Sequence, residues 1–549
     1  MKRQLSELSN QRYDLAVIGA GIHGAAIAAM AASCGLSVVL LEKGDFCSRT
    51  SANSLKILHG GLRYLQHLDV PRILDSIASR RWVMANFPEI VEPLECILLT
   101  SGHGFRSKQG MAVGLAVNDL FSLFRNRGVR LDKHLGRGRT LPFEKCQQII
   151  PGLARDHWTG GALWFDALAT NTERVVLTLI HNLVDGGGAA ANYVEVKRIL
   201  CPHGKVTGVL CHDHQAHQDI EIQADMVVNA TGAGVAQYAE DKIPQESISG
   251  WSKAVNLVLN RRFFGKYAVG LEGTSSFVDK DALVQKGKRL FFFVPWREKT
   301  MVGTVYTHVE NVDKGADLSR EEIEAILSEI NQIYPAAQLQ LRDVINYHAG
   351  FVPCIKGRHQ GHFDVQLDKR ETVLDHGAEG GVEGLYSIKT VKFTTAYTLC
   401  RDFLQRLQAK DKISKQIWKD RSRSEFVLSG EGGSLEQIPE WLVLRWGRSA
   451  TEVARRLPRE ILEDVNAGHV LTTEEIKYAV EEEMALHLDD LLFRRTGLAT
   501  IGLPEEDILQ KACVEMGALL GWDDATCLAE RGRVTHHFHP LENMQEEQA

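Results

Sequence analysis

Apolar positions near the start of the chain fall into two short runs, separated by a stretch of small residues. Residues 13–19 and 37–41 are apolar runs of strand length, and residues 25–34 are rich in alanine. Buried parallel strands have continuous apolar runs, and alanine has the highest helix propensity. Gly35 follows the small-residue stretch and is expected to end the helix. The pattern therefore predicts a strand–helix–strand unit.

The rest of the first 410 residues has the periodicity of alternating helices and strands. Ser319 and Glu322 have the spacing of a capping box and predict a helix that runs to Tyr334. The other predicted elements are helices over 71–88, 171–184 and 394–408, a β-meander over 193–223, strands at 227–232 and 384–388, and a strand-rich region over 251–306.

The C-terminal part has a different pattern. Residues 411–434 are polar and contain a glycine-rich stretch at 430–433, which is typical of a linker. Thr472 then caps a predicted helix that carries apolar residues on one face as far as Leu491. We therefore predict a separate helical domain over 435–549.

Composition excludes several classes of protein. The 549 residues suggest two to four domains, and 44% hydrophobic residues is ordinary for a soluble globular protein. A net charge of −7 argues against a nucleic-acid partner. Ten scattered cysteines without a CxxC pair are typical of a reducing compartment. The protein is expected to be cytoplasmic.

Only residues 15–41 are long and apolar enough to imitate a membrane span, and they contain His23 and several glycines. Because they match the strand–helix–strand unit better, no span is predicted. The first twelve residues lack the apolar stretch of a signal peptide. Any membrane contact is therefore expected to be peripheral, on the inner face of the cell membrane.

The glycines of the predicted unit have the spacing of a dinucleotide-binding fingerprint. Gly19 allows a tight turn, Gly21 lets the backbone approach a pyrophosphate, and Gly24 lets helix and strand pack closely. The helix N-terminus attracts the phosphates. Glu42 ends the second strand and can accept hydrogen bonds from ribose hydroxyls. NAD and FAD share this fingerprint, so these residues leave the choice between them open.

Several motifs elsewhere in the chain resemble FAD-dependent glycerol-3-phosphate dehydrogenases of the aerobic type. The most specific are the HGGLRYL segment at 59–65 and the FRRTG segment at 493–497. The resemblance covers about residues 12–535. Further matching segments lie at 51–58, 114–120, 164–166, 228–232, 295–296, 302–304, 392–395 and 483–490.

The resemblance implies an α/β fold with three parts. An FAD-binding Rossmann-like domain of the glutathione-reductase type would be interleaved with an antiparallel-sheet substrate domain, and a C-terminal α-helical domain would follow. Within residues 1–410, the implied FAD-binding segments are about 12–75, 150–250 and 345–410, and the implied substrate-cap segments are about 76–149 and 251–344.

The resemblance also implies roles for individual residues. His59 and Lys392 are the implied catalytic residues. The implied FAD-binding residues are Gly19, Gly21, Gly24, Glu42, Thr50, Ser51, Ser54, Lys56, His59, Gly232, Lys392 and Thr394. The implied substrate-binding residues are Arg63, Lys253, Lys356 and Arg358.

Alternatives remain for three of these residues. His59 could deprotonate a substrate hydroxyl or pack against the flavin, and the two glycines after it would let the backbone approach the isoalloxazine. Lys392 could bind substrate or the flavin's pyrimidine oxygens. Arg63 could anchor an anionic substrate or form a structural ion pair.

By resemblance, the enzyme oxidises glycerol 3-phosphate or a related polyol phosphate by hydride transfer to flavin N5 and passes electrons to quinone. The sequence departs from the family where substrate should bind. Val352 replaces an arginine expected to hold the phosphate, and Thr390-Val391 replaces Gly-Gly. The alternatives are a different hydroxy or amino acid substrate, or an FAD-bound module without turnover. The oligomeric state, a homodimer included, is left open.

Cysteines and histidines cluster between Cys201 and His217. Zinc prefers four thiolate or imidazole ligands in a tetrahedron, and the spacing here fits no usual zinc arrangement. No metal is therefore expected.

Overall fold

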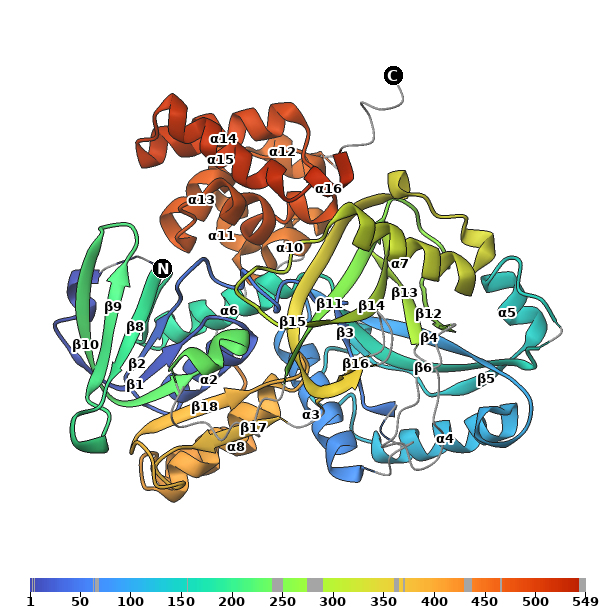
Figure 1. Ribbon diagram of the computed structural model, residues 1–549, viewed down its shortest axis with the longest axis horizontal. Helices are drawn as coiled ribbons and strands as arrows, with labels where there is room; N and C mark the ends of the chain where they lie inside the picture. The colour runs from blue at the N-terminus through green and yellow to red at the C-terminus, as the bar shows by residue number, and fades with distance from the viewer. Residues whose placement is uncertain are drawn as a thin grey trace.

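The computed structural model describes residues 1, 3, 5–62, 64, 69–155, 157–238, 250–273, 290–359, 365–368, 371–428, 437–464 and 467–542, with the side chains of 5, 6, 105, 356–359, 467 and 542 left out. The described chain has three parts, as Figure 1 shows. A mostly parallel sheet lies on one side, a larger mostly antiparallel sheet lies on the other, and a cluster of C-terminal helices packs above both.

The first sheet has the order β17-β18-β10-β1-β2-β7. The four neighbouring pairs from β18 to β7 are parallel, and β17 joins β18 in antiparallel fashion. An antiparallel meander of β8 and β9 attaches to β10 and confirms the meander predicted from sequence. The strand bounds are β1 Arg12–Ile18, β2 Val38–Leu41, β7 Ala189–Ala191, β8 Val194–Leu200, β9 Gly208–Asp213, β10 Gln218–Asn229, β17 Thr372–Asp375 and β18 Leu385–Lys389.

Helices cover this sheet. The Ala-rich helix α2 (Ile22–Ser33) is almost wholly buried, because α6 (Thr172–Asp185) and α8 (Ala396–Ala409) pack against it. Small side chains let these helices approach one another closely. Gly35 ends the helical turn with φ +87°. The strand–helix–strand unit predicted from sequence is confirmed.

The second sheet has the order β16-β15-β11-β14-β13-β12-β4-β6-β3, and β5 pairs with β6. Helix α7 (Arg320–Ile333) packs on one face, and its predicted capping box is confirmed. Helix α4 (Lys108–Phe121) contacts β5 and β6. The strand bounds are β3 Ile57–Leu58, β4 Val91–Thr100, β5 Arg139–Pro142, β6 Gly160–Ala169, β11 Gly250–Leu259, β12 Tyr267–Glu272, β13 Leu290–Trp296, β14 Lys299–Val309, β15 Val344–His359 and β16 Val365–Leu367.

The sheet pairing shifts the domain boundaries expected from sequence. Strands β3, β6 and β15 lie within the expected FAD-binding segments, yet all three belong to the second sheet. β15 pairs with β11 along ten residue positions, and β6 pairs with β4 along another ten. Sequence position alone does not reveal such long-range pairing.

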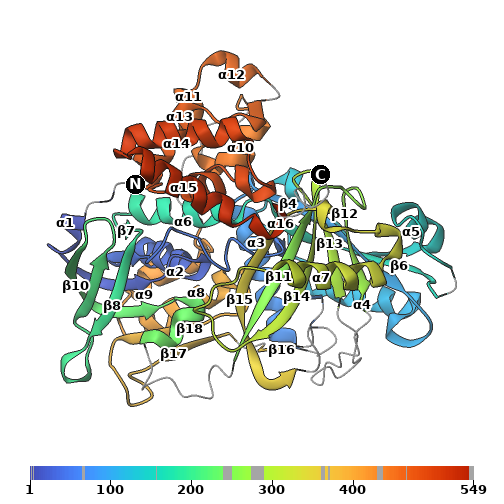
Figure 2. The same ribbon diagram turned by 45° about the horizontal axis from the view of Figure 1, so that its top comes forward.

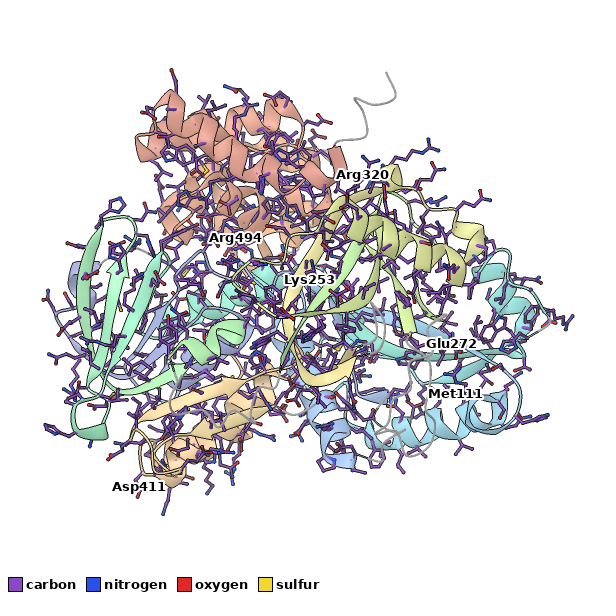
Figure 3. All side chains as sticks on the ribbon, in the orientation of Figure 1. Met111, Lys253, Glu272, Arg320, Asp411 and Arg494 are labelled. Carbon is purple, nitrogen blue, oxygen red and sulfur yellow. The ribbon has the colours of Figure 1, made fainter. Side chains whose placement is uncertain are left out.

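The helical domain contains α10 Glu440–Trp446, α11 Ala450–Arg456, α12 Arg459–Glu463, α13 Thr473–Glu483, a π-helix Asp490–Arg495, α14 Glu506–Leu520, α15 Asp524–His536 and α16 His539–Glu542. The predicted helix from Thr472 to Leu491 is too long. α13 ends at Glu483, and the left-handed backbone of its C-cap residue Met484 (φ +54°) closes the helix. Arg494 of the π-helix lies between the helical domain and the first sheet (Figure 3).

The predicted linker also contains a helix, α9 (Lys415–Arg423), which Ser414 caps through the N–H of Ile417. Trp418 packs against the core of the first sheet and holds this helix in place. The remaining helices are α1 Leu5–Leu8, α3 Val70–Asn86 and α5 Phe143–Ile149, and α3 confirms the helix expected there. Within the described residues, no helix combines the length and apolar character needed to cross a membrane.

Candidate active site

The three fingerprint glycines form a tight cradle at the start of α2. A Cβ on Gly24 would lie 1.8 Å from the carbonyl oxygen of Gly19. A Cβ on Gly19 would lie 2.8 Å from the oxygen of Ala230, and Gly19 itself has φ +98°. No other residue type fits either position. The first turn of α2 contains no acidic side chain, so its N–H groups and positive dipole end are suited to a phosphate.

Glu42 lies beside this cradle at the end of β2. Its carboxylate accepts hydrogen bonds from the N–H of Ala20 at 2.8 Å and from the N–H of Gly44 at 3.0 Å. Burial raises the pKa of Glu42, and the two N–H donors oppose that effect. Gly232 has open space where a Cβ would lie. Their part in holding a dinucleotide stays a prediction.

The loop after β2 connects the cradle to the second sheet. Ser51 Oγ accepts from the N–H of Ile22 at 3.0 Å. Thr50 Oγ1 donates to the carbonyl of Phe351 and accepts from the N–H of the same residue. A Cβ on Gly350 would lie within 2.9 Å of Thr50. The cradle and strand β15 are therefore held in fixed register.

Lys56 is fully buried and bonded within the protein. Its ammonium donates to the carbonyl of Ala52 at 2.6 Å, to Thr172 Oγ1 at 2.7 Å and to Glu173 at 3.2 Å. All three N–H groups thus have protein acceptors. Ser54 Oγ accepts from the N–H of Lys56. This arrangement favours a role in holding the loop over the direct flavin contact expected for Lys56 and Ser54.

His59 is paired with a buried carboxylate. Its Nδ1 lies 3.3 Å from Asp166 Oδ2, and its side chain is 46% exposed. Asp166 also accepts from Arg80 at 2.6 Å, from the N–H of Gly60 at 2.7 Å and from Trp164 Nε1 at 3.1 Å. Burial opposes ionisation, but these partners outweigh it and lower the pKa of Asp166 to about 2. The imidazole therefore faces a permanent carboxylate on one side and an open region on the other.

The structural requirement for glycine at the two positions after His59 differs from the one expected. A Cβ on Gly60 would lie 2.1 Å from Arg80 Nη1, and a Cβ on Gly61 would lie 3.2 Å from Ile73 and Ser76. Gly61 also has φ +88°. These glycines allow α3 to pack and Arg80 to reach Asp166. The structure thus relates them to the helix, whereas sequence reasoning related them to the flavin.

Lys392 lies near the His59 loop. Its ammonium is 4.1 Å from the ring centroid of Tyr64, a cation–π contact that joins the two segments. Thr395 Oγ1 donates to the carbonyl of Lys392 and to Glu371. Thr394 is buried beside them. The contact thus joins Lys392 to the segment that begins with His59, five residues before Tyr64.

The two faces of β11 and β15 separate Val352 from Lys253. Val352 is paired with Ser252, whereas Lys253 is paired with Phe351, so they lie on opposite faces. Lys253 Nζ is 2.5 Å from Glu322 of α7 and 3.2 Å from the carbonyl of Asp317 (Figure 3). The structure places Lys253 in an ion pair behind the sheet, away from the face expected to bind substrate.

Three other expected substrate residues cannot be placed. Arg63 and the side chains of Lys356 and Arg358 lie outside the described residues. Sequence reasoning also missed two functional candidates, Asp166 and Arg80. Asp166 stood in a matching motif, but only its contact with His59, 107 residues away, gives it a role.

The helical domain contacts the cradle's loop through a buried ionic cluster. Arg495 donates to Asp45 at 2.7 and 2.8 Å, and Arg494 also donates to Asp45. The two guanidinium groups outweigh burial and hold the pKa of Asp45 well below its usual range. Tyr193 donates to Asp490 at 2.6 Å, and its N–H donates to the carbonyl of Gly44. Arg494 and Arg495 thus join the helical domain to the loop after β2.

Two histidines of the cluster between Cys201 and His217 have carboxylate partners. His212 Nδ1 is 2.7 Å from Asp219, and His214 Nε2 is 3.1 Å from Glu195. Across the described residues, no group of three or more acidic, histidine or cysteine side chains is arranged to hold a metal ion.

Comparison with known proteins identifies the class. The family model described as "FAD dependent oxidoreductase" matches residues 14–382, and one described as "C-terminal domain of alpha-glycerophosphate oxidase" matches residues 407–527. The chain belongs to the family of FAD-dependent oxidoreductases, and its cofactor is FAD. The cradle at the start of α2, with its close-packed glycines and Glu42, fits the nucleotide part of FAD.

Within that family, the chain is similar over most of its length to glycerol-3-phosphate dehydrogenases. It is 27% identical to one from Synechocystis over 533 residues (91% of each chain), and 27% identical to an aerobic one from Bacillus subtilis over 523 residues (90% of this chain and 89% of the other). The glycerol-3-phosphate dehydrogenase from Bacillus halodurans complexed with FAD superposes with a TM-score of 0.69 at 20% identity, covering 98% and 97% of the two chains. The chain is a glycerol-3-phosphate dehydrogenase-like oxidoreductase, which confirms the resemblance found in its motifs.

Proposed function

We propose that this enzyme oxidises the secondary alcohol of glycerol 3-phosphate or a related polyol phosphate. The observation that supports this most directly is the pairing of the half-exposed His59 with the buried Asp166. An alcohol dehydrogenation needs a base for the hydroxyl proton, and a half-exposed imidazole is suited to that task. The named relatives support the choice of glycerol 3-phosphate.

The chain's own residues would bind and orient the alcohol. His59 accepts the hydroxyl proton at its exposed nitrogen, while Asp166 stabilises the resulting imidazolium. Lys392 carries a positive charge that attracts an anionic substrate. Bound FAD supplies the two-electron acceptor for the carbinol hydride. The protein thus contributes orientation and proton transfer, and the cofactor contributes the redox chemistry.

The residue at position 352 bears on which substrate is used. Val352 is partly exposed on the face of β15 that also carries Gly350, next to Thr50 of the cradle loop. Valine provides no charge for a phosphate, so the phosphate must be held by other cations. The alternative is a hydroxy or amino acid whose carboxylate needs a smaller anion site.

Anaerobic titration tests the proposal. Glycerol 3-phosphate added to the FAD-loaded enzyme should bleach the flavin absorbance near 450 nm, and dihydroxyacetone phosphate should form in equal amount. Small hydroxy and amino acids serve as the comparison set. Bleaching by one of these and not by glycerol 3-phosphate would overturn the substrate, and no bleaching by any of them would favour a module without turnover.

A peripheral membrane contact is part of the proposal, and α4 supports it. The outer face of this helix and the turn after it are apolar and open to solvent: Val113, Leu120, Leu123 and Phe124 are each 64–70% exposed. Exposed apolar side chains gathered on one face are typical of an interaction surface. Figure 1 places α4 at the outer edge of the second sheet.

The charge around this apolar face favours an anionic lipid surface as its partner. Arg127 and Arg137 follow α4 and are exposed, whereas the exposed Arg130 between them is paired with Asp132. An apolar face flanked by arginines is typical of helices that lie in the membrane interface. Such attachment would place the enzyme where a lipid-soluble quinone is available as electron acceptor.

A further inference from the structure

Four hydrogen-bond donors surround the carboxylate of Asp166, and they determine which nitrogen of His59 carries a proton. Oδ1 accepts from Arg80 Nη1 and from the N–H of Gly60, at 2.6 and 2.7 Å. Oδ2 accepts from Trp164 Nε1 at 3.1 Å and faces His59 Nδ1 at 3.3 Å. The carboxylate is 3% exposed. A buried carboxylate accepts hydrogen bonds and donates none, so Nδ1 of His59 must carry its proton.

We propose that Asp166 is a positioning residue that keeps the proton of neutral His59 on Nδ1 and leaves Nε2 free to take the substrate's hydroxyl proton. This rests on the proposed function. The O–H proton moves to Nε2, the carbon–oxygen bond becomes a carbonyl, and the two electrons leave with the carbinol hydride to FAD. The Nδ1 proton stays on His59 throughout.

Arg80 makes this arrangement permanent. It also donates to the carbonyl of Phe165 at 2.9 Å, which fixes the guanidinium against β6. A charged partner keeps Asp166 ionised at any pH at which the enzyme works. Among the described residues, the groups placed around His59 are the Asp166 carboxylate of β6, the Arg80 guanidinium of α3 behind it, and the uncharged Phe292 ring of β13, whose centroid is 6.4 Å away.

Replacing Asp166 by asparagine should invert the tautomer. The amide oxygen should face Arg80 and the N–H of Gly60, because neither of these groups can accept a hydrogen bond. The NH2 group then faces Trp164 Nε1, which loses its acceptor, and His59, which can accept. Nδ1 therefore becomes an acceptor and the proton moves to Nε2. That nitrogen can no longer accept the hydroxyl proton. Loss of a general base typically costs 10²–10⁴-fold.

The kinetic test uses the FAD-loaded D166N enzyme and anaerobic flavin reduction by glycerol 3-phosphate. We expect the reduction rate to fall about 100-fold, with FAD content unchanged and substrate affinity within about threefold. When His59→Asn is already present, adding D166N should lower the reduction rate little further, because the two residues act as one unit. Additive losses, or an unchanged rate in D166N alone, would overturn the proposal.

A second readout does not depend on turnover. Diethyl pyrocarbonate modifies the unprotonated nitrogen of an exposed imidazole, and peptide mass spectrometry reports His59 separately. At a single pH, we expect His59 to be modified more slowly in D166N, because its exposed Nε2 then carries the proton. Trp164→Phe removes a competing donor from Oδ2, strengthens the hydrogen bond from Nδ1–H and should speed the modification. This milder variant also serves if D166N does not fold.

Asp213→Asn is the matched control, since Asp213 is a buried aspartate paired with Arg3 in the first sheet. It should leave the rate of His59 modification unchanged. If glycerol 3-phosphate fails to reduce the unaltered enzyme but the modification rates change as expected, the substrate is wrong and the role of Asp166 stands. If the modification rate changes in neither variant, the role of Asp166 is wrong, whatever the substrate.

Discussion

Arg495 and Asp45 form a double hydrogen bond between residues 450 positions apart, with Nη1–Oδ2 and Nη2–Oδ1 distances of 2.7 and 2.8 Å. Both side chains are fully buried. Asp45 lies three residues after Glu42, in the loop that closes the dinucleotide cradle. Through this contact, the C-terminal helical domain supports the loop that is expected to hold FAD. Figure 2 shows this domain lying above α6 and the two sheets.

Arg495→Met should weaken both folding and FAD retention. The substitution leaves Asp45 buried with one guanidinium partner fewer, and removing one partner of a buried ion pair costs ~3–5 kcal/mol. Urea unfolding followed by released flavin fluorescence measures both effects. Arg533→Met is the control, because Arg533 is 45% exposed at its ion pair with Asp489 in the same domain. Equal flavin retention in the two variants would contradict the prediction.

Val352→Arg should improve turnover of glycerol 3-phosphate. If phosphate affinity is limited by a missing cation, a new guanidinium on this face of β15 provides a bidentate partner. We expect KM to fall by roughly tenfold or more, equivalent to at least ~1.4 kcal/mol, with kcat little changed. Steady-state assays with a quinone analogue measure this. A rise in KM would mean that the phosphate lies elsewhere or that Val352 belongs to a site for another substrate.

Ionisation of Glu371 should make the stability of the folded protein depend on pH near neutrality. Burial raises its pKa to about 7, against the opposing effect of the hydrogen bond from Thr395. A carboxyl whose pKa is raised on folding stabilises the fold fully below its unfolded value near 4.5, and this contribution is lost as the pH rises through about 7. The melting temperature should therefore decline between pH 5 and 8.

Glu371→Gln should remove this part of the decline, because a neutral amide does not ionise and still accepts from Thr395. Thermal unfolding at pH 5, 6, 7 and 8 compares the two proteins. Glu383→Gln is the control, since Glu383 is an exposed glutamate paired with Lys205 and should leave the profile unchanged. If the melting temperature changes with pH equally in the Glu371 variant and the unaltered enzyme, Glu371 is already ionised in the folded protein.

Phe124→Asp, alone or with Leu120→Asp, should reduce binding to vesicles that contain anionic phospholipid. A charge on this apolar face opposes its insertion into the interface. Cosedimentation measures the loss, and flavin content checks the fold. Leu528→Asp is the control, because Leu528 is 74% exposed on the helical domain, away from α4. The α4 face is not the membrane contact if the Phe124 and Leu528 variants lose vesicle binding equally, or if the unaltered enzyme does not bind vesicles.

The sequence alone was sufficient for features whose cause is local. The glycine spacing at 19–24, the Ala-rich helix after it and Glu42 at the end of β2 predicted the cradle as the structure has it. The capping box at Ser319 and Glu322 was also predicted. Each depends on conformations and hydrogen bonds within a few residues, which residue type and spacing encode directly.

Only the tertiary structure decided which distant residues meet. It paired His59 with Asp166 and Asp45 with Arg495, and it turned Lys253 away from Val352. It also assigned the glycines after His59 to the packing of α3. Such contacts arise from strand register and helix packing across hundreds of residues, and no periodicity along the chain records them. The local pattern thus determined how the cofactor's cradle is built, and the packing of the two sheets and the helical domain determined what surrounds it.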